Sequence, residues 1–432
     1  MITTLLFLTF IIMMLMGVPI GVALGLAGAA AIAIANSSSQ WFGLLAVPQN
    51  FYAGLGKYPL LAIPMFVLVG SIFDRSGVAG RLVNFAVAVV GRGPGMLPLV
   101  AIAVAMFLGG ISGSGPACAA AVGAVMITAM NKAGYPPAFS ASVVGAAAAT
   151  DILIPPSIAF IVYSILVPGA SVPALFAAGM IPGVLAGLAL IVPAVWLSRK
   201  HKMGALESTL PRPPFWASLR DAIWGLAAPV LILGGMRAGW FTPTEAAVVA
   251  VFYGLFVGMF IHRTMTVRDL FPILRESGEL SAVILLVVSL AGIFAYSLST
   301  LGVIDPITNA IVNSGLGEYG VLALLIVMLV TVGMFLDGVS IFLIFVPLLL
   351  PIATHYHWDL VWFGVILTLK VALGQFTPPL AVNLMVSCRI AKVRMEETVP
   401  WVGWMLFSMF LVMVLVIAFP QLALWLPHHL GY

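Results

Sequence analysis

Four short motifs combine helix-breaking residues with oxygen-bearing side chains inside otherwise apolar sequence. They are Ser112-Gly113-Ser114-Gly115-Pro116, Ile154-Pro155-Pro156-Ser157, Asp337-Gly338-Val339-Ser340, and Thr377-Pro378-Pro379 followed by Asn383. Glycine allows a sharp turn and proline ends a helix, so each motif predicts an interrupted helix. Hydroxyl and carbonyl oxygens are hard ligands that suit an alkali cation, and amides freed at a helix N-terminus suit a carboxylate. The motifs therefore indicate binding of a cation and an organic acid.

The candidate ion- and substrate-binding residues are those of the four motifs and one neighbouring threonine: Ser112, Gly113, Ser114, Gly115, Thr150, Pro155, Pro156, Ser157, Asp337, Gly338, Ser340, Thr377, Pro378 and Asn383. Within this set, the candidate sodium ligands are the hydroxyls of Ser112, Ser114, Ser340 and Thr377, with nearby backbone carbonyls. The alternative is that the motifs are packing kinks, because Gly, Ser and Pro are common in membrane helices. Four motifs at paired positions favour a binding site.

Three ionisable residues are expected within the apolar depth: Asp151, Asp337 and Lys370. Ionisable groups in such places are costly and usually functional. Lys370 could attract a substrate carboxylate, pair with Asp337, or extend its ammonium to the outer interface. Glu245 is different, because Thr242-Pro243-Thr244-Glu245 has the pattern of a capping box, which predicts a structural role.

The composition of the chain is that of an integral membrane protein. Of the 432 residues, 62% are hydrophobic and only 7% are charged, whereas soluble domains carry about 25% charged residues. Apolar runs of spanning length recur throughout, and Met1 to Met16 is expected to be the first membrane helix. The basic residues lie in short loops and form no continuous patch, which argues against a nucleic-acid partner. The two cysteines, Cys118 and Cys388, are expected to be buried small hydrophobes.

The chain also repeats itself at an offset near 225 positions. Gly77-Val78 matches Gly302-Val303 at an offset of 225, and the Pro-Pro pair of Pro155 matches that of Pro378 at 223. Loop charge reverses at every matched pair of loops: for example, 36–50 holds no Lys or Arg, whereas 261–276 holds three. With the central linker included, 15 of the 18 basic residues fall on one side. Because basic loops stay in the cytoplasm, the two halves are predicted to be inverted repeats.

Each half is expected to hold the same series of helices in an all-α polytopic membrane protein. The first half, 1–200, would hold scaffold helices over 1–92 (including 1–16, 19–35 and 51–73), a hairpin over 94–131, a broken helix over 137–166 and a closing helix over 174–198. Residues 199–220 would form a cytoplasmic linker. The second half, 221–432, would hold scaffold helices over 221–297 (221–237, 240–262 and 277–297), a hairpin over 319–353, a broken helix over 360–388 and a closing helix over 399–427. The odd number of crossings per half would place both termini in the periplasm.

Enzyme functions find little support in the sequence. The Gly56-Lys57 pair precedes Tyr58, so the phosphate-binding loop of ATPases is missing. Gly110-Ile111-Ser112-Gly113 resembles the nucleophile motif of intramembrane serine proteases, but all six histidines fall in loops or at the chain end. A stand-alone secondary carboxylate transporter or a channel remains an alternative.

The motifs also resemble a known family over essentially the whole chain. Phe107-Leu108-Gly109-Gly110-Ile111 leading into the Ser-Gly-Ser-Gly run, Tyr163 after the first Pro-Pro pair, Phe335-Leu336-Asp337, and Thr377-Pro378-Pro379 with Asn383 are similar to the large membrane subunit of tripartite ATP-independent periplasmic (TRAP) transporters. The run Pro116-Ala117-Cys118 departs from the family pattern at one point, and this departure bears on substrate choice. The resemblance implies a bacterial inner-membrane protein with sodium as coupling ion and no cofactor. It also implies two partners, a small four-helix membrane subunit and a periplasmic substrate-binding protein.

For the fold, the resemblance implies an elevator-type transporter. The two hairpins and the two broken helices would form a mobile transport domain, and the other helices a scaffold. The family's substrates are C4-dicarboxylates, sialic acid and other organic acids.

Overall fold

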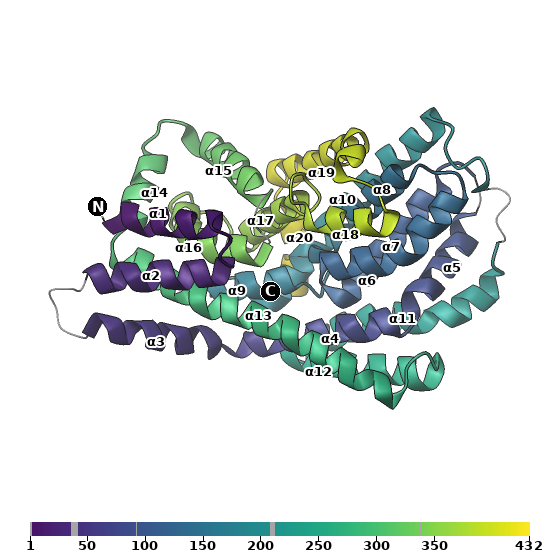
Figure 1. The fold of residues 1–432 in the computed structure, drawn as a ribbon, viewed down its shortest axis with the longest axis horizontal. Coiled ribbons are helices and arrows are strands. Elements are labelled where there is room, and N and C mark those ends of the chain that lie inside the picture. The colour runs from purple at the N-terminus through teal and green to yellow at the C-terminus, as the bar shows by residue number, and fades with distance from the viewer. Residues whose placement is uncertain (1, 36–41, 92, 208–211, 335, 337) are drawn as a thin grey trace.

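The computed structural model describes residues 2–432 except 36–41, 92, 208–211, 335 and 337 (Figure 1). The described residues form helices and connecting turns without a β-strand. Seven of the described helices are long and apolar enough to cross a membrane, among them Val172–Lys200, Val267–Thr300 and Gly338–His355. Large apolar side chains such as Leu8, Val192 and Phe252 are exposed on the outer surface. A chain with this surface is suited to lipid rather than water.

The first half begins with scaffold helices and continues into the interrupted segments. Its elements are α1 (Ile2–Leu15), α2 (Ile20–Ala35), α3 (Phe42–Leu55), the 3₁₀ turn η1 (Tyr58–Leu61), α4 (Ala62–Arg75), α5 (Val78–Val90), α6 (Met96–Ser112), α7 (Gly115–Lys132), α8 (Pro137–Ala148), the 3₁₀ turn η2 (Ala149–Ile152), α9 (Ile158–Leu166) and α10 (Val172–Lys200).

The second half follows the same order. Its elements are α11 (Phe215–Arg237), α12 (Pro243–Phe256), the π-helical turn η4 (Val257–Ile261), α13 (Val267–Thr300), α14 (Ile304–Val312), α15 (Gly317–Gly333), α16 (Gly338–His355), α17 (Leu360–Gly374), α18 (Val382–Ala391), the 3₁₀ turn η5 (Met395–Thr398), α19 (Val399–Ala418) and α20 (Gln421–Leu430). Hairpin α6–α7 thus corresponds to α15–α16, and the broken helix α8–α9 corresponds to α17–α18. The inverted orientation of the two halves stays a prediction.

Three details differ from the helices expected from sequence. The expected helix over 51–73 is interrupted after Leu55, where Gly56 and Lys57 precede a 3₁₀ turn that begins at Tyr58 and has a proline in its first positions. The expected closing helix over 399–427 ends at Ala418 and restarts at Gln421, because Pro420 cannot donate a helical amide hydrogen bond. The expected loops 74–92 and 298–319 contain the short amphipathic helices α5 and α14.

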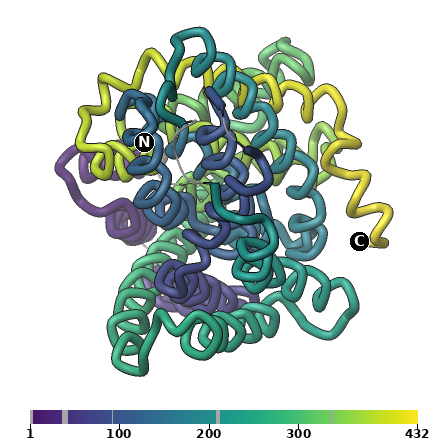
Figure 2. The backbone as a smooth tube through the Cα atoms, turned by 90° about the vertical axis from the view of Figure 1, so that its right-hand side faces the viewer, coloured from purple at the N-terminus to yellow at the C-terminus, as the bar shows by residue number. Residues whose placement is uncertain are grey.

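Two groups of helices can be distinguished by their contacts. Helix α13 packs against α2, α3 and α4, and α12 packs against α4 and α11 (Figure 1). The hairpin and broken helices form the second group, in which α18 contacts α7 and α8, and α17 contacts α15 and α16. The long helix α10 runs along this second group, touching α6, α17 and α19, and it also contacts the C-terminal helix α20, which lies at the edge of the molecule in Figure 2.

Polar contacts fix the turns that enter and leave the interrupted segments. The amide of Leu97 donates to the Glu207 carboxylate (2.9 Å), and Tyr135 donates its hydroxyl to the same carboxylate (2.5 Å). The central linker therefore holds the start of α6 and the α7–α8 turn together. Burial raises the pKa of Glu207 and of Tyr135.

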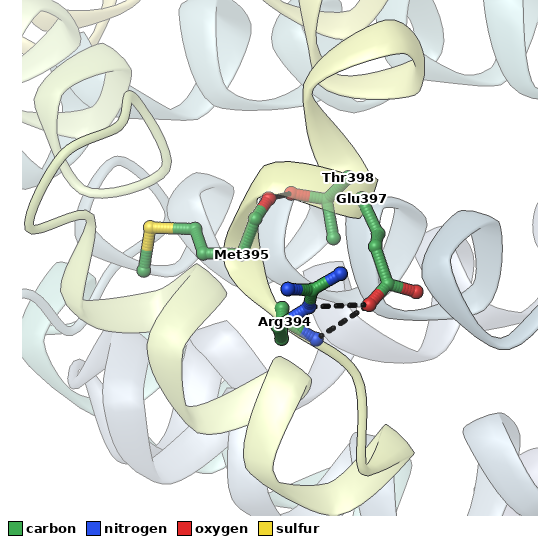
Figure 3. Close-up of polar contacts among 4 residues, drawn as sticks. All are labelled: Arg394, Met395, Glu397 and Thr398. Atoms are coloured by element: carbon green, nitrogen blue, oxygen red, sulfur yellow. Dashed lines mark hydrogen bonds and ion pairs between the residues drawn. The ribbon is translucent and has the colours of Figure 1, made fainter.

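The exit from the second broken helix is fixed by a separate cap. The backbone amide and the side chain of Arg394 both donate to Glu397 (3.3 Å each), and the Thr398 hydroxyl donates to the Met395 carbonyl (2.6 Å) (Figure 3). This cap turns the chain from α18 into α19. Cys118 and Cys388 are both buried and unpaired by disulfides, as expected.

Candidate functional site

The tip of the first hairpin is shaped by one glycine in a left-handed conformation. Helix α6 ends at Ser112, Gly113 follows with φ +60°, and α7 begins at Gly115. A Cβ atom on Gly113 would lie 2.6 Å from the Pro156 carbonyl oxygen. The tip therefore rests directly on the backbone of the first Pro-Pro break, which brings the first two motifs together.

Asp151 joins these two motifs through its side chain. It lies on η2, just before the break, and is completely buried. The Ser112 hydroxyl donates to Asp151 Oδ2 (2.9 Å), whereas Oδ1 has no hydrogen-bond partner among the described residues. Helix α6 approaches so closely that a Cβ on Gly109 would lie 2.4 Å from Oδ1. A buried carboxylate oxygen without a donor is a hard ligand that suits a cation.

The second Pro-Pro break contributes an amide pair on the other side of the hairpin tip. Asn383, at the start of α18, donates its side-chain amide to Gln375 Oε1 (3.0 Å), and its backbone amide donates to the Gln375 carbonyl (3.0 Å). Both side chains press against Gly115, where a Cβ would lie 2.6 Å from Gln375 Oε1. Asn383 Oδ1 is buried and has no hydrogen-bond partner among the described residues.

A cavity of about 90 Å³ lies where both hairpins meet the second broken helix. Its lining comes from the tip of the first hairpin, the tip of the second hairpin and the break between α17 and α18: Pro116, Gly333, Met334, Leu336, Gly374, Gln375, Leu380, Ala381 and Val382. The cavity therefore joins segments about 200 residues apart in sequence. It is polar at Gln375 and otherwise apolar.

Lys370 lies one turn before this break and is 1% exposed. Its ammonium is therefore buried inside the protein. In this conformation Lys370 does not extend to the outer interface, which was one of the three alternatives for it. Its Nζ has no hydrogen-bond partner among the described residues, and a Cβ on Gly333 would lie 3.6 Å from it. Lys370 thus lies behind the cavity wall, at the second hairpin. The expected pairing with Asp337 lies outside the described residues.

Several expected hydroxyl ligands bond to the backbone beside them. The Thr150 hydroxyl donates to the Ala147 carbonyl (2.8 Å), and the Thr377 hydroxyl donates to the Leu373 carbonyl (2.6 Å). The Ser157 hydroxyl donates to the Ile152 carbonyl (2.5 Å) and accepts from the Phe160 amide, so it caps α9. Each hydroxyl keeps acceptor capacity for a cation, but each also supports the local turn.

The remaining candidates lie at the starts of helices. Ser114 precedes α7 in an extended conformation, and Gly338 and the buried Ser340 lie in the first turn of α16. Bonds Pro155-Pro156 and Pro378-Pro379 are both cis. The capping box at Glu245 is confirmed, because Glu245 accepts from the Thr242 amide (2.8 Å) and donates its own amide to the Thr242 hydroxyl.

Sequence reasoning missed Gln375 altogether and kept Asp151 outside the set of ligands. Gln375 could have been found as a polar residue three positions before the second Pro-Pro pair, at the C-cap of an otherwise apolar helix. Asp151 has the equivalent location before the first break.

Paired hairpins and paired broken helices, meeting at a small buried site, define a multi-pass membrane transporter. Residues 7–422 match the family described as "Tripartite ATP-independent periplasmic transporter, DctM component". The chain belongs to this family, which is a family of transporter permeases.

Known proteins agree with this assignment. The chain is 37% identical to the C4-dicarboxylate TRAP transporter large permease protein DctM of Pseudomonas aeruginosa, over 94% of both chains. It is 33% identical to the sialic acid TRAP transporter large permease protein SiaM of Vibrio cholerae, over 96% of both chains. Among solved structures, the Alcanivorax borkumensis YdaH transporter has a similar fold, with a TM-score of 0.62 at 12% identity, over 93% of this chain and 98% of that one.

Proposed function

We propose that this chain is the large permease subunit of a sodium-coupled transporter that imports an organic acid across the bacterial inner membrane. The acid is a C4-dicarboxylate, sialic acid or a similar carboxylate, delivered by a periplasmic binding protein. The observation that carries the proposal is the convergence of three helix breaks on Asp151, Gln375 and Asn383 around the first hairpin tip. The names of the relatives, which transport C4-dicarboxylates and sialic acid, support the substrate class.

Sodium coupling is supported by the donor atoms. Asp151 Oδ1 and Asn383 Oδ1 are buried acceptors without donors among the described residues, on two sides of the same hairpin tip. The Ser112 hydroxyl, which donates to Asp151 Oδ2, is a third oxygen at the hairpin tip. Oxygen donors of this type suit a hard monovalent cation, and no histidine or thiolate cluster favours a softer metal among the described residues.

Substrate binding is supported by the second hairpin. The cavity beside Gln375 is small in this conformation, and Lys370 lies behind its wall. Helices α7 and α18 both begin at this cavity, so their N-terminal backbone dipoles favour a carboxylate there. A cation at Asp151 would add to that attraction. We assign Gln375 to substrate orientation and Lys370 to electrostatic attraction of the carboxylate.

An elevator movement is supported by the contacts between the two groups of helices. Helix α4 packs against both helices of the first hairpin, α6 and α7, and a Cβ on Gly70 of α4 would lie 3.4 Å from Ser112 Cβ. Lys57, at the α3–η1 break, donates to the Ile165 carbonyl at the end of α9 (2.8 Å). Both contacts connect the scaffold to the proposed transport domain, and both must change if that domain slides past α4.

Reconstitution separates this function from its alternatives. Proteoliposomes that hold this chain and its small four-helix membrane subunit are expected to accumulate a radiolabelled acid only with an inward sodium gradient and its binding protein. Uptake without the binding protein would indicate a stand-alone transporter. Downhill flux without any sodium dependence would indicate a channel and would refute the proposal.

The ion assignment has its own test. Asp151→Asn keeps the size of the side chain and removes its charge. It is expected to raise the sodium concentration for half-maximal uptake more than 10-fold, on the order of 1.4 kcal/mol or more. Sodium dependence equal to that of the unsubstituted protein would remove Asp151 from the ion site.

A further inference from the structure

A second cavity, of about 680 Å³, shares no lining residue with the cavity at the hairpin tips. It lies where α5, the start of α11 and the end of η4 meet. Its polar wall holds three guanidinium groups, from Arg81, Arg220 and Arg263, with the imidazole of His262 and the single carboxylate of Asp221. The cavity therefore carries an excess of positive charge.

The cationic wall is held in place but not neutralised. Arg81 donates to the Gly77 carbonyl (2.9 Å), and His262 Nδ1 donates to the Ser76 carbonyl (2.9 Å), so both side chains are oriented by backbone. His262 Nε2 is buried and has no hydrogen-bond partner among the described residues. Within the same residues, the ion pairs present involve none of these three arginines.

The rest of the lining is apolar and faces outward. Ile223, Trp224, Phe260 and Ile261 complete the cavity, and Phe260 is 65% exposed. These residues belong to apolar helices of spanning length: Phe260 and Ile261 end the span Pro243–Ile261, whereas Ile223 and Trp224 lie eight and nine residues after the start of the span Phe215–Arg237. Guanidinium groups beside outward-facing apolar side chains are typical of the membrane–water boundary, where tryptophan also concentrates. This end is the arginine-rich side, which is cytoplasmic under the loop-charge rule.

We propose that this cavity binds the phosphate group of an anionic phospholipid from the cytoplasmic leaflet. Arg220 and Arg263 hold the phosphate oxygens, since a guanidinium fork matches phosphate geometry. The acyl chains lie along Trp224 and Phe260. Basic cavities between helices on this side of a membrane suit lipid headgroups.

Two further features favour a lipid over a free anion or a protein segment. The apolar half of the lining would contribute nothing to inorganic phosphate, whereas it continues the hydrocarbon surface for a lipid. The volume suits a headgroup rather than a helix, which would need a groove about 10 Å wide. Burial, with Arg81 adding to the effect, lowers the pKa of His262. A bound anion opposes that shift and favours the imidazolium, which donates through Nε2.

Thermal unfolding of the delipidated, detergent-solubilised chain tests the proposal. Dioleoyl phosphatidylglycerol is expected to raise the melting temperature by roughly 3 °C at a concentration about 100 times its Kd, and phosphatidylcholine to raise it little. The variant Arg220→Gln/Arg263→Asn should lose this difference. Asn is used at 263 because Arg263 has φ +53°, a conformation that Asn tolerates. Arg268→Gln, which removes one positive charge at an exposed position outside the cavity, should keep it.

Quenching of tryptophan fluorescence by brominated lipids tests the same proposal without the arginine variants. Brominated phosphatidylglycerol should quench tryptophan fluorescence more than brominated phosphatidylcholine. The excess should disappear in Trp224→Phe, which keeps every cation.

Three results would overturn the proposal. The first is stabilisation by inorganic phosphate or glycerol 3-phosphate equal to that by the lipid, which would assign the cavity to a free anion. The second is an unchanged lipid effect in the double variant together with unchanged quenching in Trp224→Phe. The third is loss of the lipid effect when the small membrane subunit is copurified, which would assign the cavity to a protein contact.

Discussion

Helix α6 lies so close to η2 that a single added methyl group tests the proposed ion site. In Gly109→Ala, the new Cβ would lie 2.4 Å from Asp151 Oδ1 and 2.9 Å from Asp151 Cα. Ordinary van der Waals contacts begin at about 3.4 Å, so the Asp151 carboxylate must move away from the new methyl group by about 1 Å. Because backbone is involved as well as a flexible carboxylate, rotation of the side chain alone cannot relieve the overlap. The retreat must also disturb the 2.9 Å bond from Ser112 to Oδ2.

Overpacking of this kind costs about 1–3 kcal/mol. If the cost falls on the ion-bound geometry, sodium affinity falls by roughly 5- to 150-fold. The assay is sodium-dependent uptake into proteoliposomes, with the amount of inserted protein measured in the same vesicles. The expected result for Gly109→Ala is a raised sodium concentration for half-maximal uptake.

Gly278→Ala is the matched control. Its Cβ meets nothing within 4 Å in α13, and helix propensity favours alanine there by about 1 kcal/mol. It should leave sodium dependence unchanged. Normal insertion of Gly109→Ala with the same half-maximal sodium concentration as the control would refute the assignment of Asp151 Oδ1 to the ion.

Three further predictions concern the second break, the topology and the movement. Asn383→Leu removes the donor to the buried amide of Gln375 and should cost about 1–3 kcal/mol, measured as lowered thermal stability together with lost uptake. Asp305→Cys should react with an impermeant thiol reagent from the periplasm and Ala205→Cys should not; labelling of both from one side would contradict the inverted repeat. A disulfide between cysteines introduced at Gly70 and Ser112, whose Cβ atoms would be 3.4 Å apart, should stop transport until it is reduced. The references are the two proteins that carry only Gly70→Cys or only Ser112→Cys, since the second shows the effect of losing the Ser112 hydroxyl by itself. Full activity of the oxidised protein would favour a fixed site over an elevator.

The helix breaks could be predicted from sequence because their cause is local. Gly113 adopts the left-handed conformation that only glycine takes readily, and the Pro-Pro pairs end α8–η2 and α17 within a few residues of the expected positions. The break at Lys57 was missed, since a single Pro59 in an apolar run is compatible with the first turn of a continuing helix. Sequence therefore identified the interrupted segments more reliably than it identified continuous helices.

The contacts of the site could not be predicted in the same way. Ser112 and Asp151 are 39 positions apart, and their bond depends on the packing of α6 against η2. The meeting of Gly115 with Gln375 joins opposite halves of the chain, which no local pattern specifies. The hydroxyls of Thr150 and Thr377 looked like free ligands in sequence, but each bonds to a backbone carbonyl within its own turn. Local hydrogen bonds of this kind are common for Ser and Thr.

The charges of the site give a physical reason for coupling an ion to an acid. A buried carboxylate such as Asp151 is costly unless an opposite charge compensates it, and among the described residues its side-chain donor is the neutral Ser112. A cation supplies that compensation, and its charge then favours a carboxylate at the neighbouring break beside Gln375. Since coupling between two ligands is reciprocal, the acid must strengthen cation binding by the same factor. A transport domain that carried the acid without the cation would move two uncompensated negative charges through the membrane, that of Asp151 and that of the acid, whereas the cation compensates one of them.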